Sequence, residues 1–115
     1  MSDVINPVDV ERAIRETATE IAKQVRVVSN AEREARRTRV VYDRAFAQAY
    51  LAAEGPAHEK KYRAELVTVQ ERDAMEIAEL AFRHAERQAK ALDGKLRAFQ
   101  SIGASVRQMY ATGVG

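Results

Sequence analysis

Few residues in this chain of 115 have the types and spacing that catalysis, metal binding or phosphate binding requires. Cysteine is absent from the sequence, which excludes disulfides, thiolate metal sites and cysteine nucleophiles. The two histidines, His58 and His84, belong to no metal-binding motif such as His-x-x-x-His. The five glycines are scattered and form no phosphate-binding loop. We therefore expect no catalytic residue, no metal site and no cofactor, and a protein that is not an enzyme.

Basic side chains form a dense cluster at Arg33, Arg36, Arg37 and Arg39. Such a run could neutralise phosphates along a helix. In an antiparallel hairpin that turns at residues 55–56, however, residue i lies opposite about 111 − i, so this run faces an acidic segment around Asp73. Charge pairing within the fold therefore accounts for most of this cluster.

From Arg87 onward, the second segment carries another basic group and a single acidic residue, Asp93. Side chains of this kind can contact phosphate or an acidic partner. These candidate contacts are Arg87, Lys90, Lys95, Arg97 and Arg107.

Two prolines indicate where helices begin. Asn6 can cap a helix whose first residue is Pro7. Gly55 can end that helix, and Pro56 can open the next one. We expect one helix over about 7–54, a turn at 55–56, a second helix over about 57–110 and a frayed tail at 111–115, all within a single helical domain of residues 1–115.

Apolar residues recur about every 3.5 residues in both segments, which is the coiled-coil period. We call the row of residues on each helix that faces the other helix the seam. In the first segment the expected seam passes through Ala18, Ile21, Val25 and Val28, and its spacing is irregular before Ala35. In the second it passes from Met75 through Leu92 and Gly103 to Tyr110. The predicted fold class is all-α, a long antiparallel helical hairpin.

Two possible breaks leave an alternative open. Ser29 and Glu32 match a capping box, and Asp93-Gly94 is a turn-like dipeptide. Breaks at both places would fold the chain into a short four-helix bundle.

The second segment carries more apolar residues than one seam uses. They form another stripe beside the seam, and a second copy of the chain could cover it in a dimeric four-helix bundle. A folded-back end of the same chain is the alternative cover. The residues of this expected oligomer interface are Tyr62, Leu66, Val69, Ile77 and Leu80.

Hydropathy argues against a membrane location. No apolar run approaches the roughly 18 residues that a spanning helix needs. The first residues, Met1 to Val4, lack the pattern of a signal peptide. We expect no membrane contact and a cytoplasmic location, that of the bacterial host if the chain is encoded by a phage.

Several short segments resemble a known group of proteins. They are Val41-Tyr42 to Gly55, Tyr62-Arg63, Glu71 to Ala74, and Leu92, Leu96, Phe99 to Ser101 and Arg107. The chain resembles small helical-hairpin proteins of unassigned activity from the early, DNA-metabolism regions of actinobacterial tailed phages and prophages. The resemblance implies a phage or mobile-element context and an accessory role in DNA metabolism.

These observations lead to one main functional hypothesis and two alternatives. The main hypothesis is a non-enzymatic helical module for protein–protein interaction that forms homo-oligomers and binds a phage or host protein. The first alternative is an accessory protein that binds nucleic acid without sequence preference. The second is a phage-encoded inhibitor of a host protein.

Overall fold

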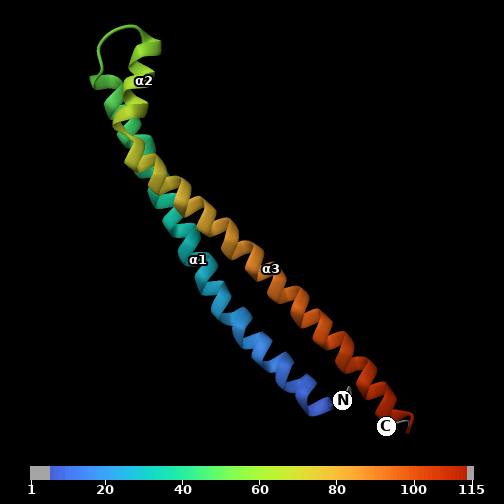
Figure 1. The fold of residues 1–115 in the computed structure, drawn as a ribbon. Coiled ribbons are helices and arrows are strands. Elements are labelled where there is room, and N and C mark those ends of the chain that lie inside the picture. Colours follow the sequence, from blue (N-terminus) through green and yellow to red (C-terminus); the bar gives the residue numbers. More distant parts are fainter. Residues whose placement is uncertain (1–5, 114–115) are drawn as a thin grey trace. The chain divides into compact units, whose positions relative to one another are not determined.

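The computed structural model describes residues 6–113, and they form an all-α helical hairpin, as predicted (Figure 1). Its helices are α1 (Pro7–Ala52), α2 (Ala57–Val67) and α3 (Val69–Ala111). Two compact units are formed: unit 1 from residues 6–26 with 86–113, and unit 2 from residues 27–85. Of the expected tail, Ala111 ends α3, Thr112 and Gly113 form a turn, and residues 114–115 lie outside the described part, as do residues 1–5.

Both expected helix starts are present. The Asn6 side-chain oxygen accepts a hydrogen bond from the Val8 backbone N–H at 2.9 Å, which satisfies a donor that a helix leaves unpaired at its first turn. α1 ends at Ala52, and Gly55 then adopts a positive φ of 106°, where a side chain would be strained. α2 follows directly after Pro56.

The hairpin has two arms, α1 as the first and α2 followed by α3 as the second. The second arm is interrupted at Thr68, a residue that no sequence pattern indicates. Its backbone N–H and its hydroxyl both donate to the Ala64 carbonyl oxygen, at 3.1 and 2.7 Å. A hydroxyl that shares a helix carbonyl in this way can distort the helix locally, although Thr17 makes the same bond to Ala13 without interrupting α1. By contrast, α1 continues through Ser29 and α3 continues through Gly94, so neither of the two considered breaks occurs.

The buried face of α1 repeats in strictly alternating steps of four and three residues. This differs from the expected seam because Ala18 and Val25 are exposed, Val25 by 63%. Thr17 and Gln24 take their places, and the spacing irregularity disappears. The seam of α1 consists of Val10, Ile14, Thr17, Ile21, Gln24, Val28, Ala31, Ala35, Thr38, Tyr42, Ala45 and Ala49, each buried or half-buried.

The opposing seam continues without a change of phase from α2 into α3. It keeps the same alternation across Thr68, whereas Tyr110, expected at its end, is exposed. Its residues, each buried or half-buried, are Ala64, Thr68, Glu71, Met75, Ala78, Phe82, Ala85, Ala89, Leu92, Leu96, Phe99, Gly103 and Val106.

The two units fill their seams differently. In unit 1, valine and isoleucine of α1 and large residues of α3 such as Leu92 and Phe99 line the seam. An ideal Cβ on Gly103 would lie 3.3 Å from Val10 and 3.8 Å from Ile14, so the helices of unit 1 approach closely there. In unit 2, alanine and threonine dominate both sides of the seam. Unit 2 therefore buries little large apolar surface between its own helices.

The pairing of the arms is shifted from the expected one by about one helical turn or more. In unit 1, Lys95 bonds Glu20 at 3.5 Å, whereas residue 91 was expected opposite Glu20. In unit 2, Arg39 lies 3.8 Å from Glu79. The shift arises at the turn, because Arg63 donates to the Glu54 carbonyl oxygen at 3.1 Å. The first turn of α2 therefore lies beyond the end of α1.

The seam register can be tested with two valines that differ in burial. Val28→Ala should lower the free energy of unfolding by about 1–2 kcal/mol, because it removes buried methyl groups. Val25→Ala should change it by less than about 0.5 kcal/mol, because the side chain is already in water. Urea denaturation followed by circular dichroism measures both. Equal losses in the two variants would contradict the observed register.

Two helical glycines offer a second test. Nothing lies within 4 Å of a Cβ placed on Gly94, so Gly94→Ala should stabilise the protein by about 1 kcal/mol through helix propensity alone. Gly103→Leu should destabilise it, because its side chain would overlap Val10. Thermal melting of both variants checks this pair, and a stable Gly103→Leu protein would show that the helices of unit 1 do not approach closely.

Candidate interaction surface

The five apolar residues expected at an oligomer interface are exposed in the single chain. Their exposed fractions range from 36% at Val69 to 75% at Leu66. All five lie on α2 and α3 within unit 2. We call this set, Tyr62, Leu66, Val69, Ile77 and Leu80, the outer stripe.

The outer stripe lies opposite the seam, and not beside it as the sequence suggested. Each of its members is two residues away from a seam residue, as Leu66 is from Ala64 and Leu80 is from Ala78. Two residues along an α-helix correspond to a rotation of about 200°. The second arm of unit 2 therefore has one face against α1 and an apolar face on its far side.

Further large apolar residues of unit 2 are also exposed. Leu51 and Val67 are exposed by 78% and 71%, and Val40 and Val41 by about half. Val41 also lines a shallow groove of about 230 Å³ with Thr38 and Ala74. Unit 2 thus keeps mostly alanine and threonine in its seam, beside Val28, Tyr42, Met75 and Phe82, while several large apolar residues lie on its surface, unlike an ordinary monomeric domain.

An aromatic ladder lies near the turn of unit 2. The ring of Phe46 is 6.1 Å from that of Tyr42 and 6.4 Å from that of Tyr50. The Lys60 ammonium lies 4.8 Å from the centre of the Tyr50 ring, a cation–π distance. Tyr42, Phe46 and Tyr50 are half-buried, so the ladder supports the end of α1 and leaves Tyr62 as the exposed tyrosine of α2.

Three of the four residues of the first basic cluster, Arg36, Arg37 and Arg39, form ion pairs, and none of these is with Asp73. Arg36 bonds Glu32 at 3.5 Å, and Arg37 bonds Glu34 at 2.6 Å, both within α1. The hydrogen bonds from Arg37 lower the pKa of Glu34, and the same contact raises the pKa of Arg37. Among the ion pairs of residues 6–113, the one between Arg39 and Glu79 joins this cluster to α3.

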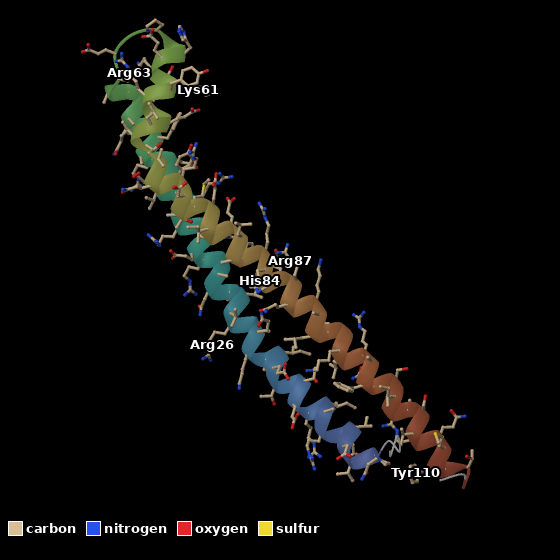
Figure 2. The ribbon with its side chains drawn as sticks, in the orientation of Figure 1. Arg26, Lys61, Arg63, His84, Arg87 and Tyr110 are labelled. Atoms are coloured by element: carbon tan, nitrogen blue, oxygen red, sulfur yellow. The ribbon has the colours of Figure 1, made fainter. Side chains whose placement is uncertain are left out.

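The second basic group is only partly paired. Lys95 bonds Glu20 of α1, which the sequence had not indicated. Within residues 6–113, Arg87, Lys90, Arg97 and Arg107 form no ion pair. Arg87, Lys90 and Arg97 are exposed, and their spacing of three and seven residues places them on one face of α3. Figure 2 shows Arg87 on the side of α3 that faces away from α1.

A groove of unit 1 lies beside the Glu20–Lys95 ion pair. It has a volume of about 450 Å³, with Ala91 and Leu92 as apolar lining and Lys23 at its polar edge. Gln24 and Gln88 complete the lining. Sequence reasoning missed this groove because Gln24 had not been recognised as a seam residue.

Neither histidine lies in a cluster suited to chemistry. His58 and His84 are both exposed. Among residues 6–113, no group of three histidine, aspartate or glutamate side chains could hold a metal ion. Over the same residues, no helix is both long enough and apolar enough to cross a membrane.

Known proteins add nothing to this description. Comparisons of the chain with protein-family models, with curated proteins and with solved structures found no match.

Proposed function

We propose that this protein is a non-enzymatic helical interaction module that associates with itself through unit 2. The observation that supports this proposal is the inverted distribution of side chains in unit 2, with alanine and threonine in the seam and the outer stripe in water. Exposed apolar stripes of this kind mark protein interaction surfaces.

The apolar surface of the outer stripe is of the order that association requires. Full burial of an exposed valine, leucine or isoleucine contributes about 1.5–3 kcal/mol. A symmetric dimer would bury the five residues of each copy. Because their exposed fractions sum to about three full side chains per copy, burial in a dimer would contribute about 9–18 kcal/mol, which is comparable with the roughly 4–15 kcal/mol that association costs in lost freedom of motion.

The biological setting of this module is proposed from the resemblance alone. The chain resembles phage and prophage helical-hairpin proteins, and we propose an accessory role in phage or mobile-element DNA metabolism. In that role the self-associated module would present exposed residues outside the outer stripe, such as Leu51 and Val40, to a phage or host protein.

Self-association is tested by placing charges in the outer stripe. Leu66→Glu combined with Leu80→Glu should convert a dimer into a monomer, because the two carboxylates would have to be desolvated at the interface. Sedimentation velocity at micromolar concentration measures the change. The matched control is Val25→Glu, an exposed position of unit 1 outside the outer stripe, which should remain dimeric. A wild-type protein that is monomeric at every concentration would contradict the proposal.

Nucleic-acid binding is the second candidate function, and the unpaired face of Arg87, Lys90 and Arg97 favours it. Cations without protein partners are available to neutralise phosphates, and such binding depends steeply on salt. This function would not require the outer stripe.

Fluorescence anisotropy with single- and double-stranded oligonucleotides at low and moderate salt tests this second function. Replacing Arg87, Lys90 and Arg97 by glutamate should abolish binding. Replacing Arg36 and Arg37 by glutamate should have a smaller effect, because Glu32 and Glu34 already pair with them. Absence of binding at low salt, or equal loss in both variants, would contradict the assignment to this face.

A further inference from the structure

We infer that the outer stripe binds the outer stripe of a second copy in antiparallel orientation. The two-fold axis lies between the two stripes, at the level of residue 71 along the helix. This inference rests on the proposed self-association and adds the partner, the orientation and the register. Three observations support it: the spacing of the stripe, the charges along it, and its position opposite the seam.

The spacing of the outer stripe is nearly symmetric about its midpoint. Tyr62 and Leu80 lie nine residues before and after residue 71, and Leu66 and Ile77 lie five before and six after it. A two-fold dimer is isologous, so a residue that contacts a partner residue is contacted in the same way in return. An antiparallel pair centred at residue 71 therefore sets Tyr62 against Leu80 of the second copy and Leu66 against its Ile77.

The charges along the stripe favour the same orientation. Residues 58–66 carry three cations (Lys60, Lys61 and Arg63) and two acids, whereas residues 76–84, which lie opposite them in this register, carry two acids (Glu76 and Glu79) and one cation (Arg83). Antiparallel packing sets a net positive segment beside a net negative one at both ends of the interface. Parallel packing would set the acidic segment beside its own copy, which costs free energy.

Asp73 adds to this difference, because it lies on the same helix face as the outer stripe, four residues from Val69 and from Ile77. In a parallel dimer the two Asp73 carboxylates would face each other at the centre of an apolar interface. In the antiparallel dimer the two Asp73 residues are offset by about 6 Å along the helix axis. Each lies level with Val69 and Gln70 of the second copy, and the Gln70 amide can donate a hydrogen bond to it.

The position of the stripe determines how four helices can combine. In a square four-helix bundle each helix contacts its two neighbours through adjoining faces. Here the second arm of unit 2 contacts α1 through one face, and its outer stripe lies about 200° away. The two copies of unit 2 therefore pack as a layer, with the second arms in the middle and the α1 segments outside.

Cysteine cross-linking tests the orientation directly, because the natural chain contains no cysteine. Two single variants are made, Tyr62→Cys and Leu80→Cys, and their helicity and dimeric state are confirmed by circular dichroism and sedimentation. Each variant alone, and an equilibrated equimolar mixture of both, is then treated with a short bis-maleimide. Ala18→Cys, exposed and in unit 1, measures cross-linking by random collision.

The antiparallel dimer predicts covalent dimers in the mixture and only collision-level cross-linking in each variant alone. In that dimer two copies of residue 62 are about 27 Å apart, beyond the reach of the reagent. Cross-linking of each variant with itself would overturn the antiparallel orientation while leaving self-association intact. Dimers that cross-link in neither experiment would overturn the outer stripe as the interface. A monomeric wild-type protein in sedimentation would instead overturn the proposed self-association, and with it this inference.

Discussion

The seam between the two arms is the interaction on which the rest of this structure depends. Its positions alternate by four and three residues along α1 and along the second arm, including the step across Thr68. This alternation keeps one face of each helix toward the other over the whole of each unit. What fills those positions then decides how much each unit stabilises itself, and unit 2, with alanine and threonine there, buries the least large apolar surface.

Threonine at the seam illustrates how a polar residue can occupy such a position. Thr17, Thr38 and Thr68 are almost fully buried, and each hydroxyl donates to a carbonyl oxygen four residues earlier, at 2.7, 2.9 and 2.7 Å. A buried hydroxyl that is satisfied within its own helix needs no partner across the seam. Such residues allow close approach of the helices, but they contribute less apolar burial than valine or leucine would.

Much of the fold could be predicted from the sequence because the residues that begin and end its helices act on their immediate neighbours in the chain. Asn6 and Pro7 begin α1 and Gly55 and Pro56 separate the arms, as their backbone preferences require. The seam of α1 was partly wrong because apolar Ala18 and Val25 were preferred over Thr17 and Gln24, and residue type alone does not show that a hydroxyl will be satisfied inside its own helix. The pairing of the arms was wrong because it depends on the path of the turn at Glu54 and Arg63.

The apolar excess of the sequence indicates which residues form the outer stripe, but not on which face of the helix they lie relative to the seam. The outer stripe was identified from apolar excess, and its members are exposed. Its place opposite the seam could not be derived until the seam itself was known to run through Ala64, Thr68 and Glu71. The Glu20–Lys95 pair was likewise hidden, because it joins residues 75 positions apart in sequence.

The unbroken alternation of the seam also restricts how this protein can change in length over evolution. Seven residues complete two turns of the coiled-coil repeat, so gain or loss of a whole repeat leaves every later side chain on its original face. A change of one residue would rotate the remainder of the helix by about 100° and take the seam away from the opposite arm. Since both arms must stay matched, natural variants of different length should differ by paired repeats, one in α1 and one in α3, while the turn around Gly55 keeps its length.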